Sequence, residues 1–536
     1  CRGARKGAHV SVRQSDDSNQ LSVDPTGVAN LDLVLGGGIP RGTLVIVVGP
    51  PGSGKTTLAN QMAFAAAHSG RKAMVLTALS EPTSKLIAHL RSFTFYDDEL
   101  VGDMVQFLSL QQFLPDGLES TGDELVAAAH RARAGYVVLD GFRGVRGVDM
   151  DPQAARQFLY DVGTTLSVLG TTTLITSEAD PRDPSFFPEA TTADLIIGLH
   201  YSLEGVRQWR GIEVIKVRGA APLSGLHGLA LNADGAIVYP RLEARVAADS
   251  HGSRLGQLDA GDDADIQLEQ QGVLDGRAPF GIPGLDNLLG GGLMRGTSTM
   301  VVGGLGTGKT MLALHFALAG AQAGEPTLFL SLRESRRQLV MKAEPFALGD
   351  TLKAMLAPAG ALTLFRWSPV ELVPDIMANQ LMASIDELGI RRLVVDSSAE
   401  LERAVAEGPR PRVDNYLAAL VEALRMRGVT ALFTKEVRQV EAVELDFSNN
   451  AISVMAENVL LLRKVEQAGQ LRRLLSVIKM RFSAYATSMV HEFLISAPEG
   501  ISVNEAPAPG TETAAVDTET RGGREPSLQE NPEGTP

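Results

Sequence analysis

The residues with the most specific chemistry in this chain lie in two glycine-rich loops of identical spacing, at 49–56 and 303–310. Each loop has Gly, four further residues, then Gly, Lys and Thr. In this pattern, backbone N–H groups surround phosphate oxygens, the lysine reaches the β- and γ-phosphates, and the hydroxyl binds Mg²⁺. The residues expected at a nucleotide are Gly49, Gly52, Ser53, Gly54, Lys55, Thr56 and Thr57 in the first loop and Gly303, Gly306, Thr307, Gly308, Lys309 and Thr310 in the second. We therefore expect at least one half of the chain to bind a nucleotide with Mg²⁺, with Thr56 and Thr310 as metal contacts.

The two loops belong to a longer internal repeat. An apolar run, 44–48 or 298–302, precedes each loop, which is the strand-then-loop context that the motif requires. Five residues of the first half recur 254 residues later: Gly27, Asp32, Arg41, Gly42 and Lys55 recur as Gly281, Asp286, Arg295, Gly296 and Lys309. A repeat of this length argues against a chance match of both loops.

Two aspartates, Asp140 and Asp396, each end an apolar β-type run downstream of a loop. A carboxylate in this place helps to hold the Mg²⁺ of P-loop enzymes. The alternative is that each aspartate only caps the helix that follows its strand. Recurrence in both halves favours the metal role.

The order of elements predicts an α/β fold in each half. The sequence predicts strands at 73–77, 136–140 and 172–175, and again at 326–330, 392–396 and 431–433, with helices between them. Strands that alternate with helices indicate a mostly parallel sheet flanked by helices. Each half closes with two more apolar runs, 195–200 with 212–217 and 459–463 with 474–480, which predict an antiparallel hairpin.

The length of 536 residues is too great for a single core and suits two domains. We expect a disordered arm at 1–22, domain one at 23–246, an acidic linker at 247–277, domain two at 278–504 and a disordered tail at 505–536. The arm and the tail have too few apolar residues to build a core.

Acidic residues just after the second strand of each half could orient or deprotonate an attacking water. The candidates are Glu81 in the first half and Glu334 in the second. The alternative is a solvated glutamate at the start of a helix.

Each half also ends with a Lys-x-Arg tripeptide on a predicted strand, Lys216 with Arg218 and Lys479 with Arg481. Residues two apart on a strand emerge on the same face, so both cations could reach the γ-phosphate held by a neighbouring subunit. The alternative is an edge strand whose cations form salt bridges.

The bulk composition excludes some classes of protein. A formal net charge of −14 argues against a surface built to hold nucleic acid, so we expect no DNA binding. Cys1 is the only cysteine, which excludes an intramolecular disulfide and suggests a reducing, cytoplasmic compartment. No run of 18 apolar residues is present, so we expect no membrane span.

The loops, the strand-end aspartates, the Gly-rich lead-in at 36–42 and 290–296 and the closing Lys-x-Arg together resemble the KaiC circadian-clock group of RecA-like ATPases. The resemblance covers most of the chain and implies two tandem RecA-like P-loop NTPase domains. It also implies a ring, usually a hexamer, with ATP and Mg²⁺ bound between subunits and the Lys-x-Arg cations acting in trans. Slow ATP hydrolysis, and Ser/Thr autophosphorylation in domain two, are further implications.

The chain departs from this group at three places. The group has two adjacent glutamates where this chain has Ser80-Glu81 and Arg333-Glu334, so the carboxylate usually credited as the base is absent from both halves. The paired Ser-Thr phosphoacceptors correspond to Ser453-Val454, which leaves Ser453 as the candidate acceptor unless it only begins a strand. Asp140 is followed by Gly141 rather than serine.

Three functions compete on these grounds. The first is a slow ATPase with possible autokinase activity that acts in signalling with partners the sequence does not identify. The second is a nucleotide-gated scaffold with one or both catalytic sites inactive. The third, a RecA-type recombinase, is least favoured because the chain is acidic and has no DNA-binding module.

Overall fold

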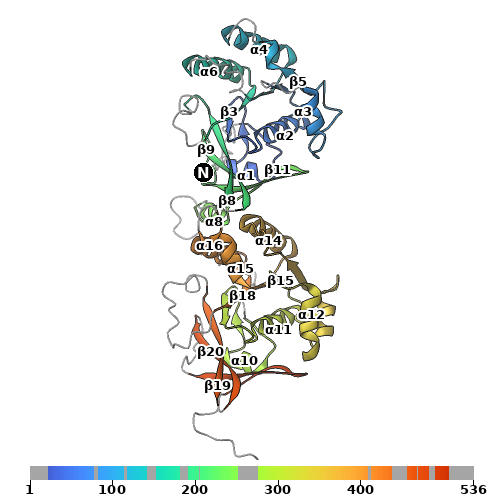
Figure 1. Cartoon of the computed structure of the whole chain (residues 1–536), viewed down its shortest axis with the longest axis vertical. Coiled ribbons are helices and arrows are strands. Elements are labelled where there is room, and N and C mark those ends of the chain that lie inside the picture. The colour runs from blue at the N-terminus through green and yellow to red at the C-terminus, as the bar shows by residue number, and fades with distance from the viewer. Residues whose placement is uncertain are drawn as a thin grey trace, which may run out of the picture.

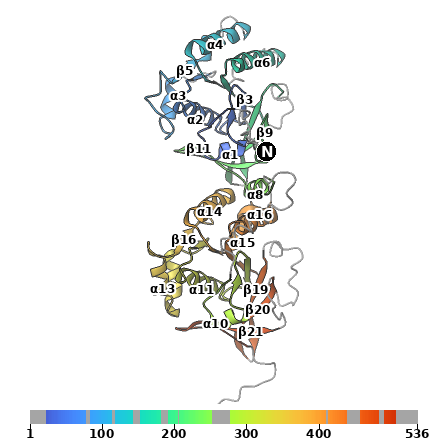
Figure 2. The same cartoon turned by 180° about the vertical axis from the view of Figure 1, so that it is seen from behind.

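The computed structural model describes residues 22–77, 83–113, 118–141, 152–180, 191–204, 206–251, 276–408, 412–437, 456–467, 469–481 and 489–505. Two α/β units lie end to end along the long axis of the molecule, with helix α8 (Leu242–His251) between them (Figures 1 and 2). Within the described residues, no helix is long and apolar enough to cross a membrane.

The first unit is built on a sheet of nine strands in the order β11-β10-β9-β8-β3-β7-β6-β4-β5. Neighbours from β5 to β8 are parallel, and those from β8 to β11 are antiparallel. The strands are β3 (Leu44–Val48), β4 (Ala73–Thr77), β5 (Val105–Ser109), β6 (Tyr136–Asp140), β7 (Thr172–Ser177), β8 (Leu195–Glu204), β9 (Arg207–Val217), β10 (His227–Asn232) and β11 (Gly235–Tyr239).

The second unit repeats this order strand for strand as β22-β21-β20-β19-β14-β18-β17-β15-β16. Its strands are β14 (Ser298–Gly303), β15 (Thr327–Ser331), β16 (Leu362–Arg366), β17 (Arg392–Asp396), β18 (Thr430–Glu436), β19 (Asn458–Gln467), β20 (Gln470–Met480), β21 (Val490–Ser496) and β22 (Gly500–Glu505). The predicted fold of two tandem, mostly parallel α/β domains is confirmed, and so are the closing hairpins, β8 with β9 and β19 with β20.

Helices cover both faces of each sheet, which is why the central strands β3, β4, β6 and β7 are buried along their whole length. The helices of the first unit are α1 (Leu31–Leu35), α2 (Lys55–His68), α3 (Thr83–Leu90), α4 (Leu118–Ala132) and α6 (Pro152–Val168). Those of the second are α10 (Pro283–Leu288), α11 (Lys309–Gln322), α12 (Arg336–Ala343), α13 (Gly349–Met355), α14 (Pro374–Leu388), α15 (Ser398–Ala406) and α16 (Val413–Arg425). Small two-stranded sheets, β1 (Val23–Asp24) with β2 (Ile39–Pro40) and β12 (Arg277–Ala278) with β13 (Leu293–Met294), complete the units.

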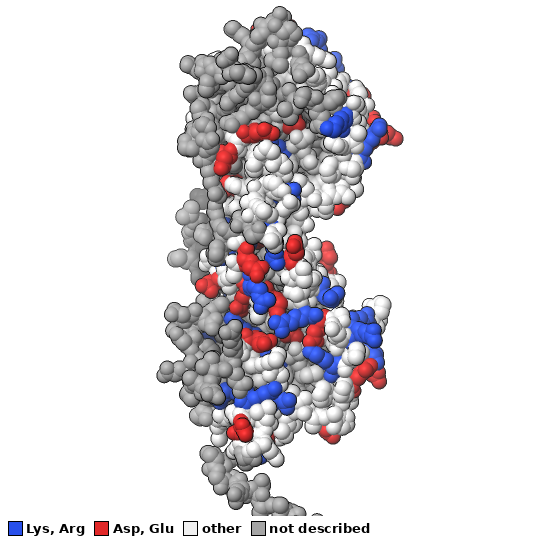
Figure 3. All heavy atoms as spheres, viewed as in Figure 1, with Lys and Arg blue, Asp and Glu red and all other residues white. Residues whose placement is uncertain are grey.

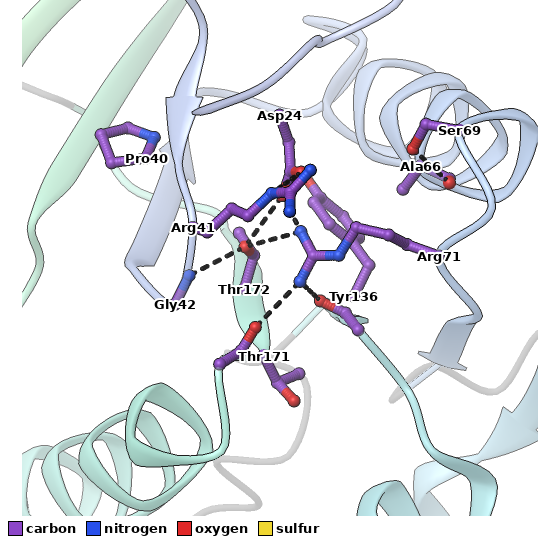
Figure 4. Close-up of polar contacts among 12 residues, drawn as sticks. Asp24, Pro40, Arg41, Gly42, Ala66, Ser69, Arg71, Tyr136, Thr171 and Thr172 are labelled. Atoms are coloured by element: carbon purple, nitrogen blue, oxygen red, sulfur yellow. Dashed lines mark hydrogen bonds and ion pairs between the residues drawn. The ribbon is translucent and has the colours of Figure 1, made fainter. Parts of the chain in front are cut away.

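A buried ion cluster ties the start of the first unit to its sheet (Figure 4). Asp24 lies between Arg41, at 2.9 Å, and Arg71, and its side chain is only 2% exposed. Thr172 joins the cluster because its hydroxyl donates to Asp24 and accepts from the Gly42 amide at 3.2 Å. The cluster therefore joins β1, the β2–β3 turn and β7.

The second unit keeps an arginine–carboxylate–arginine cluster but builds it from other positions. Glu325 bonds Arg295 and Arg392, the latter with 2.5 Å between Oε2 and Nε. By the repeat and the strand register, Glu325 occupies the place of Arg71, and Arg392 that of Tyr136. The carboxylate of the cluster therefore lies on β1 in the first unit and in the loop before β15 in the second unit.

Helix α8 packs on α16 and joins the two units. Leu242 lies in the hydrophobic core of the second unit, and Glu243 accepts bonds from Arg412 at 2.5 and 2.6 Å. The Asn379 amide donates to the Pro240 carbonyl at 2.9 Å. Helix α8 continues to His251, so residues 247–251 of the predicted linker are helical.

Acidic and basic side chains are intermixed over the second unit on the face shown in Figure 3. Mixed signs on one face do not make the continuous positive surface that phosphate backbones require.

Candidate nucleotide sites

Each glycine-rich loop joins the central strand of its sheet to a buried helix, β3 to α2 and β14 to α11. The residues before the two lysines, Gly54 and Gly308, have φ angles of 102° and 105°, a left-handed conformation that favours glycine. Space is also lacking, because a Cβ on Gly308 would lie 2.5 Å from the side chain of Ile495. These glycines bring the loop backbone and the helix N-terminus together, which is the geometry of an anion site.

The two loop lysines are held in the same way. Lys55 Nζ donates to the carbonyls of Gly49 and Pro50 at 2.9 and 3.0 Å. Lys309 Nζ donates to Gly303 and Gly304 at 2.9 and 2.8 Å. Burial lowers the pKa of both lysines, and nearby carboxylates oppose the shift. Each ammonium group is thus positioned above its loop.

The predicted metal residues lie together in both halves. Thr56 Oγ1 donates to Asp140 Oδ2 at 2.9 Å, and Thr310 Oγ1 donates to Asp396 Oδ2 at 2.9 Å. Burial raises the pKa of Asp140, while bonds from Thr176 and Thr56 partly offset it. A second hydroxyl donates to each carboxylate, from Thr176 to Asp140 and from Thr434 to Asp396. These two threonines were not among the predicted site residues.

This donor set fits Mg²⁺. A hydroxyl and one carboxylate are hard oxygen ligands, and Mg²⁺ in nucleotide sites takes one or two carboxylates and completes its shell with phosphates and waters. Within the described part of the chain, no cluster of three or more His, Cys, Asp or Glu could hold a metal alone. A metal here would therefore depend on the nucleotide.

A cavity of about 460 Å³ opens above the second loop. Its wall includes Lys309, Thr310, Asp396, Arg333, Glu334, Glu436, Arg473, Phe346 and Ile495. The predicted acid Glu334 belongs to this site: Lys342 binds its Oε1, and its Oε2 is buried with no hydrogen-bond partner among the described residues.

Arg333 is also part of this wall. Its guanidinium bonds Glu400, in the first turn of α15, and Glu436 at 3.3 Å. The other oxygen of Glu400 accepts a bond from Ser397 at 2.5 Å, directly after Asp396. A cation therefore lies beside the second phosphate-binding loop, directly before Glu334 in the sequence.

Glu178 and Glu436 are site residues that the sequence reasoning missed. They occupy equivalent places after β7 and at the end of β18, and each stabilises the charged form of its loop lysine, Lys55 or Lys309. The repeat of Thr-x-Glu at 176–178 and 434–436 was the signal that could have identified them.

The Lys-x-Arg cations lie near the start of the parallel strands, away from the loops of their own chain. Lys216 donates to the Thr191 carbonyl at 3.4 Å, and Arg218 pairs with Asp194 at 3.2 Å. Lys479 donates to the Ala456 carbonyl at 2.7 Å. Neither Lys479 nor Arg481, both of which the structure describes, lines the cavity of the second loop. One chain does not bring them to its own nucleotide site.

Two of the predicted residues, Glu81 and Ser453, lie outside the described residues. Their roles as a base and as a phosphoacceptor remain predictions.

Comparison with known proteins agrees with this geometry. A family model described as the KaiC ATPase matches residues 24–243 and again residues 278–508. The chain belongs to the KaiC ATPase family. The predicted family is thereby confirmed.

Relatives of the KaiC family match the chain along nearly its whole length. A circadian clock oscillator protein KaiC of Thermostichus vulcanus is 24% identical over 499 residues, which are 91% of this chain and 90% of the relative. KaiC 1 of a Synechocystis species is 24% identical over 482 residues, 88% and 87% of the two chains. KaiC of a Nostoc species has the same identity and coverage. The similarity thus extends across both halves of this chain and over 87–90% of each of these relatives.

Proposed function

We propose that this KaiC-family protein binds ATP in both halves and hydrolyses it slowly. The observation that carries the proposal is the repeated bond between the loop threonine and the strand-end aspartate, 2.9 Å in each half. An arrangement without function would have little reason to keep the same lysine, threonine and aspartate geometry twice in one chain.

In this proposal, the loop amides and Lys55 or Lys309 bind the β- and γ-phosphates. Mg²⁺, when bound with the nucleotide, neutralises charge that develops on the phosphate oxygens. Thr56 with Asp140, and Thr310 with Asp396, hold that ion. In the second half, the apolar side chains of Phe346 and Ile495 supply a surface for the adenine ring of ATP.

The two halves should differ in turnover. A guanidinium cannot accept a proton, so Arg333 supplies positive charge to the second site but no base. The carboxylates of Glu334 and Glu436 both line this cavity, and either could accept a proton from a water or a serine hydroxyl there. We infer that the second half mainly holds ATP and that any phosphoryl transfer from it goes slowly, with Ser453 as the candidate acceptor.

A nucleotide-gated scaffold is the second candidate function. The pairing of Arg333 with Glu400 favours it, because this ion pair fills the place of a base and connects the second site to α15. The scaffold would bind ATP tightly without turnover in the second half.

In our proposal, the active assembly is a ring of subunits, and the family resemblance implies that the ring is a hexamer. The Lys-x-Arg cations of one subunit would then complete the sites of its neighbour, which agrees with their distance from their own loops. A role in signalling in the cytoplasm, with further protein partners, extends the proposal; its support is that the relatives are named circadian clock oscillator proteins.

The test is incubation of the purified protein with ATP labelled on its γ-phosphate, followed by separation of free phosphate from label on the protein. We expect free phosphate that falls strongly in Lys55→Ala and weakly in Lys309→Ala. Protein label that disappears in Ser453→Ala would establish the autokinase. ATP binding with neither signal would reject the ATPase and leave the scaffold, and absence of ATP binding would reject both.

A further inference from the structure

A second cavity, of about 300 Å³, lies between the two halves of the chain next to α8. The first half contributes Arg207 and Trp209 on β9 and the segments on either side of the β10–β11 hairpin. The second half contributes the start of α14 and the end of α15. The volume is at the lower end of the range for ligand cavities, roughly 300–1,000 Å³, and such cavities occur preferentially at domain interfaces.

Most charges around this cavity are already compensated. Arg412 bonds Asp375 at 2.6 Å and also Glu243, and Arg207 pairs with Glu407 at 3.3 Å. Arg412 and Asp375 are therefore not available to a ligand of either sign.

Arg241 is different. Its Nη2 donates to the Ser224 carbonyl at 3.1 Å, its Nε is buried with no hydrogen-bond partner, and no carboxylate among the described residues pairs with it. Room for the guanidinium comes from Gly225, where a Cβ would lie 2.5 Å from Arg241 Nη2. Glu371 also lines the cavity without an ion-pair partner among the described residues, but it is exposed, whereas Arg241 is half-buried. The inner part of the cavity therefore offers a guanidinium with an unpaired donor, Nε, which suits a carboxylate or a phosphate.

A flat apolar wall completes the cavity. The Trp209 indole lies against the backbone of Gly211, where a Cβ would be 2.2 Å from the ring. Leu226, Pro374 and Val405 extend the apolar surface beside it. An indole face and a neighbouring aliphatic surface suit an aromatic ring, which stacks in an offset arrangement.

We infer that this interdomain cavity binds a small aromatic acid, with its ring against Trp209 and its carboxylate or phosphate on Arg241. This site is separate from the nucleotide loops and does not depend on their activity. Helix α15 connects the two regions, because it begins just after Ser397 in the second nucleotide cavity and its end lines the interdomain cavity.

The chain itself supplies the reporter for a test, since it has two tryptophans, Trp209 and Trp367. In the Trp367→Phe protein, saturated with Mg-ATP, emission from Trp209 is followed during titration with benzoate, phenyl phosphate and neutral benzyl alcohol. We expect saturable changes with at least one of the two anions and a much weaker response to benzyl alcohol. The anion that binds more tightly identifies the carboxylate or the phosphate as the natural acidic group.

Arg241→Gln should weaken anion binding roughly ten- to hundredfold, the effect of losing hydrogen bonds to a charged group. Arg245→Gln is the matched control: Arg245 lies on α8, also bonds across the interface, to Asn379 at 3.3 Å, and does not line the cavity. Unchanged Trp209 emission with both anions, equal binding of benzyl alcohol, or equal losses in the two arginine variants would each overturn the inference. Loss of binding in a Lys55→Ala/Lys309→Ala protein would also overturn it, because the probe would then occupy the nucleotide sites.

Discussion

The guanidinium of Arg333 is bonded to the carboxylate of Glu400, and this pair lies beside the second phosphate-binding loop. Glu400 is nearly inaccessible, with a side chain 3% exposed, whereas Arg333 is 51% exposed and faces the cavity. The guanidinium therefore lies at the cavity surface, above the buried carboxylate of Glu400 and beside the partly exposed carboxylate of Glu436 at 3.3 Å. A terminal phosphate bound at the second loop would therefore lie near this cation.

Arg333→Met should lower the affinity of the second half for ATP about tenfold, because a charge-assisted bond to the γ-phosphate would be lost. Binding is measured in a Lys55→Ala background, so that only the second half contributes. Affinity for ADP should change much less, since ADP lacks the γ-phosphate. An equal loss for both nucleotides would show that Arg333 acts on the fold of the site rather than on the terminal phosphate.

Asp140→Asn should raise the Mg²⁺ concentration needed for turnover by roughly 10–100-fold or more, because the variant loses the carboxylate that helps to hold the ion and that orients the Thr56 hydroxyl. The measurement is phosphate release during a Mg²⁺ titration at saturating ATP. Asp103→Asn is the control, since Asp103 is an exposed aspartate of the same half that pairs only with Lys72 among the described residues. Equal Mg²⁺ requirements in the Asp140→Asn protein and the wild type would contradict the metal role.

The same Asp140→Asn protein should be more stable than the wild type near neutral pH when nucleotide and Mg²⁺ are absent. Burial raises the pKa of Asp140, so its contribution to stability is full below 3.8, the ordinary pKa of the group, and is lost as the pH rises through the folded-state value. Asparagine has no such loss. Thermal unfolding at several pH values should show an advantage of the variant that shrinks as the pH falls toward 3.8. A constant difference at all pH values would exclude ionisation of Asp140 as its cause.

Arg392→Met should destabilise the second half by about 3 kcal/mol, because it leaves Glu325 partly uncompensated in a buried place. Arg392 is fully buried and also donates to the carbonyls of Pro279 at 2.8 Å and Phe316 at 3.2 Å, so these backbone connections are lost together with the ion pair. Urea unfolding gives the free energy. In the control, Arg425→Met, loss of the surface pair with Glu422 should cost less than about 0.5 kcal/mol.

Mixing subunits that carry Lys55→Ala with subunits that carry Arg218→Ala should restore part of the ATP hydrolysis. Lys55→Ala damages the loop of the first half, and Arg218→Ala removes a cation that lies away from that loop in its own chain. If Arg218 acts on a neighbouring subunit, each variant alone should lose most of its ATP hydrolysis, and a mixture should regain part of the activity. Mixed oligomers that form but stay inactive would contradict action in trans.

The sequence alone determined the features that depend on local order. The loops, the apolar strands and Asp140 and Asp396 are read directly, because a phosphate loop needs glycine at fixed places and a buried parallel strand needs a continuous apolar run. Because the same loops, strands and aspartates occur in both halves, their prediction was stronger than it would have been from one half alone. Family membership was read from the same residues.

The tertiary structure decided the contacts between distant residues. Arg333 and Glu400 are 67 positions apart, and so are Glu325 and Arg392. No sequence pattern pairs such residues, because a charge has no period and its partner depends on how strands and helices pack. For the same reason, only the packing of α8 against the second half revealed the interdomain cavity and the unpaired Nε of Arg241 beside it.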